Sequence, residues 1–161
     1  MNQTLEQLIK LQEIDQRLLE IKNFMGDLPF MVETQEKDVA AMKSDNDEKQ
    51  SRITQIEKET RHYEREIEGI NTQMVKYKEQ LYLVKSNKEY DSLNHEIDHM
   101  KTNISDFETQ LLNLIEEKEA LEETIKIKTE KIESITVSLS SNKIELQSAM
   151  AETQNEQKKL E

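Results

Sequence analysis

Two apolar seams run along most of the chain at the spacing of a coiled coil. In the first, core residues recur at alternating steps of three and four from Ile53 to Val84, and only Thr60 is polar. The second seam has the same spacing and runs from Tyr90 to Leu146. Its polar exceptions are Lys118, Lys128 and Asn142. A heptad pattern sustained over this length indicates long α-helices packed in a coiled coil.

The two seams differ in phase, and the change falls at the tip, residues 85–89. The first seam would place its next core residue at 88, whereas the second begins at Tyr90. A shift of two is not one of the insertions of three or four residues that a continuous coil absorbs. Ser86-Asn87-Lys88-Glu89 also has the S-x-x-E form of a capping box, with Ser86 as N-cap. We therefore predict a helical hairpin whose first helix ends here without glycine.

A hairpin with this tip predicts which residues face one another. If Val84 lies opposite Tyr90, the numbers of facing residues sum to 174. This register places Asn46 opposite Lys128, so two polar core residues share one layer. Such a polar layer fixes the register at some cost in stability.

The N-terminal segment is more apolar than a two-helix seam requires. Residues at core spacing are Leu11, Ile14, Leu18, Ile21 and Met25, and apolar residues outside that stripe are Leu5, Leu8, Ile9 and Leu19. One interpretation is packing against a third helix or self-association. The other is a docking face for a partner or for a further domain. The sequence favours neither.

Gly26-Asp27-Leu28-Pro29 is the only break of its kind in the chain. Proline ends or kinks a helix. The heptad phase continues across it from Met25 to Val32, which favours a kink over a reversal. We predict an all-α, elongated antiparallel coiled-coil hairpin with a kinked N-terminal extension. It is one coiled-coil domain over 1–161, with an N-terminal helix at 1–25, a first long arm at 30–84, the tip at 85–89 and a second long arm at 87–160.

Composition agrees with long helices and limits the function. The 161 residues include 2 Gly and 1 Pro, and 35% are charged. A net charge of −12 argues against general nucleic-acid binding. No Cys is present, so disulfides and Cys zinc ligands are excluded within this chain. The N-terminus has no signal-peptide pattern, and no apolar run approaches the ~18 residues of a membrane span. We expect a cytoplasmic protein without membrane contact.

Three motifs resemble a known family. The chain contains Leu8-Ile9-Lys10-Leu11-Gln12-Glu13-Ile14-Asp15, the Leu28-Pro29 break and a tip of the form V-x-x-N-K-E-Y-x-x-L-x-x-E-I from Val84 to Ile97. It is similar to the N-terminal coiled-coil domain of the bacterial C4-type zinc-ribbon proteins. The Cys-containing ribbon is missing, either truncated or lost in this member. The resemblance implies a non-enzymatic adaptor. Family members are linked to partner proteins, including an alternative sigma factor and secretion components, and to nucleic acids, and the fold does not choose among these roles.

The tip is the strongest candidate site. Between Met74 and Lys88 there are four lysines against one acid, Glu79. The candidate residues are Lys76, Lys78, Tyr82, Leu83, Lys85, Asn87 and Lys88. Lysines beside exposed aromatic residues suit phosphates and bases or an acidic protein. The alternative is a solvated helix end whose lysines complement the helix dipole.

Metal and catalytic sites are not predicted. His95 and His99 share a helix face, but no third ligand stands at a fixed offset. No nucleophile motif or Gly-rich phosphate loop occurs. We expect no cofactor in this chain, with zinc only if a C-terminal ribbon exists outside it, and no enzymatic activity.

The sequence therefore predicts an adaptor or chaperone-like protein that binds a protein partner through the tip and the N-terminal helix, where Leu5, Leu8, Ile9 and Leu19 lie. The alternatives are nucleic-acid binding through the basic tip with a missing ribbon, and a structural spacer or oligomerisation rod. A homodimer is a further option.

Overall fold

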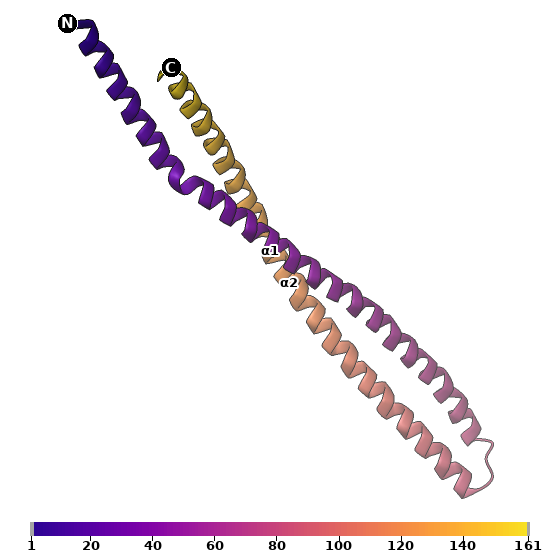
Figure 1. Cartoon of the computed structure of the whole chain (residues 1–161). Coiled ribbons are helices and arrows are strands. Elements are labelled where there is room, and N and C mark those ends of the chain that lie inside the picture. The colour runs from indigo at the N-terminus through magenta and orange to yellow at the C-terminus, as the bar shows by residue number, and fades with distance from the viewer. Residues whose placement is uncertain (1, 161) are drawn as a thin grey trace. The chain divides into compact units, whose positions relative to one another are not determined.

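The computed structural model describes residues 2–160, which form two helices. Helix α1 spans Asn2–Leu81 and helix α2 spans Asn87–Leu160 (Figure 1). No strand occurs in this part of the chain. The predicted all-α coiled-coil hairpin is confirmed. By its internal contacts, the chain divides into unit 1, Met1–Asn46 with Ile127–Glu161, and unit 2, Asp47–Lys126.

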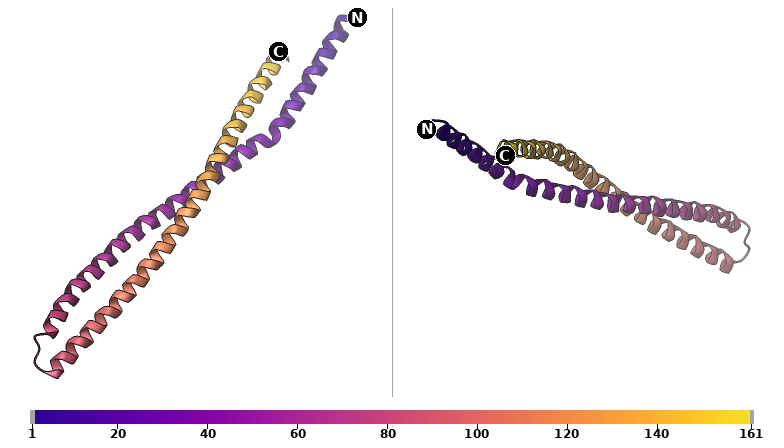
Figure 2. Two further views of the ribbon diagram at one scale, coloured as in Figure 1. Left: turned by 180° about the vertical axis from the view of Figure 1, so that it is seen from behind. Right: turned by 45° about the horizontal axis from the view of Figure 1, so that its top comes forward.

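Unit 2 contains the most deeply buried side chains, and they are the predicted seam residues. Its buried apolar residues are Ile53, Ile56, Met74, Ile97, Met100 and Leu114. Met74, Ile97 and Met100 form one cluster, against which Ile70 and Ile104 pack. Both helices thus supply core residues to the seam, and they run side by side toward the tip (Figure 2).

Contacts between the helices of unit 2 confirm the predicted register. Arg52 pairs with Glu117, and Glu57 pairs with Lys118. The rings of Tyr63 and Phe107 lie 5.5 Å apart. The numbers of these contacting residues sum to values from 169 to 175. These values lie within about one helical turn of 174, as expected because a knob touches residues above and below its layer.

Unit 1 has a shallower core with polar layers. Its buried apolar residues are Ile21, Leu28, Val32, Val39 and Ala149. Asn46 donates to Thr129 over 3.4 Å, and Lys128 forms an ion pair with Asp45. The predicted polar layer of Asn46 and Lys128 is therefore present. Gln35 makes a second polar contact across the seam, because it accepts a hydrogen bond from Asn142 at 3.0 Å.

The boundaries of the first helix differ from the prediction at both ends of the expected first arm. The segments expected at 1–25 and 30–84 are one helix, α1, with Pro29 inside it. Leu28 and Val32 are both buried, and their packing on either side of Pro29 offsets the lost backbone hydrogen bond. The ribbon bends in this early part of α1, as the predicted kink requires (Figure 1). The helix ends at Leu81 rather than at residue 84.

Two predicted seam residues are exposed, which corrects the extent of both seams. Tyr90 is exposed because its register partner, Val84, lies beyond the last residue of α1. Leu11 is also exposed, so the seam of the described chain does not reach this residue.

Candidate functional site

Helix α1 ends at the tip by tightening its last turn. The N–H of Tyr82 donates to the Glu79 carbonyl at 3.2 Å, and that of Leu83 donates to the Gln80 carbonyl at 2.9 Å. Bonds of this three-residue span satisfy carbonyls that the helix leaves open. No residue of 2–160 has a positive φ, so the helix ends without a left-handed cap. This confirms the glycine-free ending that the sequence predicts.

Helix α2 begins at the predicted N-cap. The Ser86 hydroxyl oxygen accepts a hydrogen bond from the Glu89 backbone N–H at 3.1 Å. The N–H of Tyr90 donates to the Ser86 carbonyl at 3.1 Å. Ser86 therefore satisfies a donor that the first turn would otherwise leave open. The cap fixes the point at which the chain enters α2, and with it the position of the tip.

The tip exposes two large side chains. Tyr82 is 90% exposed and Leu83 is 76% exposed, because both follow the last residue of α1 and lie outside the seam. The other predicted tip residues are also exposed: Lys76, Lys78, Lys85, Asn87 and Lys88. Three acidic residues partly neutralise the positive charge of the four lysines in this region: Glu79, Glu89 and Asp91. The tip is therefore an apolar pair with a mildly basic surround.

The N-terminal part of α1 exposes a second apolar surface. Leu5, Leu8 and Ile9 have the spacing that places side chains on one helix face, and each is about half exposed, between 49% and 59%. Leu19 is exposed to a similar extent. No other element of the described chain covers these side chains. The interpretation as packing against a third helix of this chain thus has no counterpart within residues 2–160.

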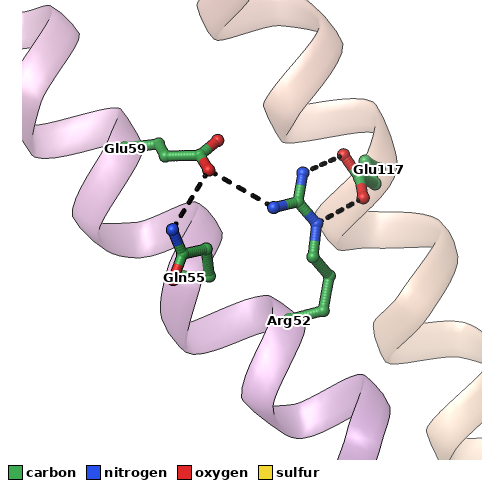
Figure 3. Close-up of polar contacts among 4 residues, drawn as sticks. All are labelled: Arg52, Gln55, Glu59 and Glu117. Carbon is green, nitrogen blue, oxygen red and sulfur yellow. Dashed lines mark hydrogen bonds and ion pairs between the residues drawn. The ribbon is translucent and has the colours of Figure 1, made fainter.

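Arg52 is the centre of a polar network that the heptad pattern alone did not predict. Arg52 donates to both carboxylate oxygens of Glu117, at 2.7 and 3.0 Å, and also to Glu59 at 3.3 Å (Figure 3). Gln55 donates to the same Glu59 oxygen at 3.5 Å. The pairing of Arg52 with Glu117 could have been predicted from the sequence. Both residues hold heptad position g, and g positions face each other across an antiparallel coiled coil.

This network shifts the ionisation of its members. The hydrogen bonds from Arg52, together with its positive charge, lower the pKa of Glu117 below its usual value of 4.5. The same contact with Glu117 raises the pKa of Arg52. Both groups remain ionised near neutral pH. The network lies beside the seam and joins the two helices, so its role is in pairing rather than in chemistry.

Other chemistry is sparse in the described chain. His95 and His99 are exposed on α2. Residues 2–160 contain no group of three or more His, Cys, Asp or Glu side chains arranged to hold a metal ion. The ribbon that the resemblance implies would need Cys ligands, and this chain has none. In the same range, neither helix has the apolar length needed to cross a membrane.

The fold and these surfaces define a two-helix coiled-coil hairpin protein. Residues 11–161 match the family model of the CT398-like coiled coil hairpin domain, and the chain belongs to this family. No curated protein and no solved structure matches the chain. A coiled-coil hairpin domain is typically non-catalytic and is consistent with a structural or adaptor role.

Proposed function

We propose that the chain is a non-enzymatic adaptor that binds a protein partner through the tip and the N-terminal face of α1. The observation that carries this proposal is the exposure of Tyr82 and Leu83 side by side at the tip. Tyrosine is enriched among the residues that dominate binding energy at protein interfaces. Only 4% of the residues in the chain are aromatic, so an almost fully exposed Tyr at a turn is unusual for this sequence and favours a binding role for Tyr82.

The surround of the tip indicates the chemistry of the partner. Exposed lysines flank Tyr82 and Leu83, and the rest of the chain is acidic, with a net charge of −12. A matching surface has an apolar pocket rimmed by carboxylates, because rim charges steer the encounter while the buried anchors supply the affinity. The half-exposed face of Leu5, Leu8 and Ile9 offers a second apolar contact.

The second candidate function is nucleic-acid binding, and the four exposed tip lysines with Tyr82 favour it. In this version the resemblance to the zinc-ribbon proteins extends to function, and a ribbon outside this sequence completes the site. Three acids stand close to the four lysines, which weakens the attraction for phosphates. We therefore prefer the protein partner.

Two sets of variants separate the candidates. The first is Tyr82→Ala with Leu83→Ala, and the second reverses charge at Lys76, Lys78, Lys85 and Lys88. Val75→Ala is the matched control, since Val75 is an exposed apolar residue of α1 close to the tip. Immobilised variants are compared for the proteins they retain from cell extract. A labelled single-stranded oligonucleotide is titrated by fluorescence anisotropy at increasing salt.

The adaptor proposal expects a set of proteins that wild type and Val75→Ala retain and that the Tyr82/Leu83 variant loses. It also expects little oligonucleotide binding. Salt-sensitive binding of the oligonucleotide that only charge reversal removes would favour nucleic acid instead. If both variants retain the same proteins as wild type, the tip is a spacer and the proposal fails.

A further inference from the structure

The outward face of α2 in unit 1 has a second heptad stripe that no helix of the described chain covers. Its members alternate at steps of three and four residues and are all exposed: Ser134, Val137, Ser141, Ile144, Ser148 and Ala151. We call these six residues the outer stripe. Val137 is 71% exposed and Ile144 is 64% exposed. The seam residues Ile135 and Leu139 of the same segment are half-buried, so α1 packs on the other side.

The outer stripe differs from the rest of the same helix face. It carries no charge over 18 residues, although 35% of the chain is charged. At the stripe positions beyond it, Glu130 precedes Ser134, and Asn155 and then Lys158 follow Ala151. Within unit 2 the equivalent heptad positions of α2 include Asp106, Glu116 and Glu123. A solvated face has no need for two exposed β-branched side chains at core spacing. The pattern is that of a coiled-coil seam.

We propose that the outer stripe is the interface with a second copy of this chain, packed antiparallel about a two-fold axis. With the axis between residues 142 and 143, Val137 of one copy lies opposite Ser148 of the other. Ser141 lies opposite Ile144 in the same way. Every β-branched residue thus faces a serine, which lets large and small side chains interdigitate. A two-fold interface must be self-complementary, and this alternation of sizes satisfies that condition.

A parallel pairing of the same stripe fits less well. Val137 would then face Val137, and Ser141 would face Ser141, so large layers would alternate with small ones. In this register Lys131 of one copy is level with Gln154 of the other, and Glu133 is level with Glu152. The antiparallel pairing is therefore supported by the interdigitation of large and small side chains and not by the flanking charges.

The expected dimer is weak and depends on concentration. The outer stripe is about 26 Å long at 1.5 Å per residue, and only one face of one helix contributes. An interface of this size is at the low end of those that form specifically. Dimerisation through this face is independent of what the tip binds, so the two proposals stand or fall separately.

Sedimentation velocity on the full chain over a range of concentrations tests the interface. We expect wild type to shift from monomer to dimer, and Val137→Glu with Ile144→Glu to weaken association by about tenfold or more, because like charges would enter the seam. Leu112→Glu is the matched control. Leu112 is 63% exposed on α2 but lies outside the stripe. Circular dichroism checks that each variant keeps its helices. A wild type that stays monomeric, or a stripe variant that associates like wild type, overturns the proposal.

Disulfide trapping tests whether the two copies pack antiparallel or parallel. The chain has no natural Cys that could form competing disulfides. Single variants Val137→Cys and Ser148→Cys are oxidised alone and as a mixture. The antiparallel register expects a mixed disulfide dimer and little crosslinking of either variant alone. Efficient crosslinking of Val137→Cys alone indicates parallel packing and contradicts the proposal, as does the absence of any dimer.

Discussion

Units 1 and 2 share the same heptad pattern but differ in the residues that occupy its core positions. In unit 2 both helices bury large apolar side chains, and Ile56 is only 1% exposed. In unit 1 the buried apolar residues come mainly from α1, and polar contacts such as Asn46 with Thr129 enter the seam. Buried apolar area supplies stability, whereas polar layers supply register. The comparison therefore assigns most of the stability to unit 2.

Truncating the deepest side chain of unit 2 should have the largest effect. Ile56→Ala removes a fully buried branched side chain, and we expect the free energy of unfolding to fall by about 2–5 kcal/mol. Urea unfolding followed by circular dichroism measures it. Val39→Ala is the matched change in unit 1, and it should cost less because Val39 is smaller and less buried. Equal losses would remove the contrast between the units.

Replacing the polar layer of unit 1 should raise stability. Asn46→Leu with Lys128→Leu and Asp45→Ala puts apolar side chains at two core positions and removes both partners of the Lys128–Asp45 ion pair, and we expect a gain of about 1–2 kcal/mol. The same variant should also pair less uniquely, because the polar layer no longer penalises slipped registers. Urea unfolding gives the first result, and the width of spin-label distance distributions gives the second. A loss of stability would mean that the layer contributes more than pairing specificity.

Removing the N-cap at the tip should have an effect of about 1 kcal/mol. Ser86→Ala deletes the hydroxyl that accepts from the Glu89 N–H and should lower stability by that amount. Ser92→Ala, at an exposed position in the body of α2, is the control and should change little. Urea midpoints compare the two. If both variants match wild type, the first turn of α2 does not depend on this cap.

The smallest effect is expected from the exposed Arg52 network, and it depends on pH. Folding lowers the pKa of Glu117, so its contribution is present above the usual value of 4.5 and is lost as pH falls through the lower folded value. Glu117→Gln should therefore be slightly less stable than wild type at pH 7 and equal to it at strongly acidic pH. Urea midpoints against pH measure this. Glu116→Gln, at the neighbouring exposed position, should not show the same convergence. A difference for Glu117→Gln that persists in acid would contradict the assignment.

Much of the fold follows from the sequence because the core residues of a coiled coil recur along the chain at a simple, regular spacing. The seam positions from Ile53 to Val84 are all buried or half-buried, as the heptad pattern predicts. The pattern does not report where the partner helix ends, which is why Tyr90 was wrongly predicted as a packed seam residue. It also does not weigh the helix-breaking tendency of Pro29 against the burial of Leu28 and Val32, a balance that only packing decides.

The candidate site could be predicted in part. Heptad phase placed Tyr82 and Leu83 outside the seam, and the capping box located Ser86. The exposure of the lysines follows from the same positions. The identity of a partner does not follow, because binding depends on the shape and charge of a second molecule. The Arg52 network was missed because pairing at g positions requires the register to be applied to every flanking residue.

The central claim is the antiparallel pairing of α1 and α2 in unit 2 at a register sum of 174. Electron spin-resonance distances between labels at Glu66 and Glu108, in protein diluted with unlabelled chain, test it directly. Packed helices have axes about 8–10 Å apart, so the labels should be roughly 10–25 Å apart at any dilution. One continuous helix would separate them by about 63 Å, since 42 residues rise 1.5 Å each. A distance of that size, or a short distance that disappears on dilution, would contradict the hairpin.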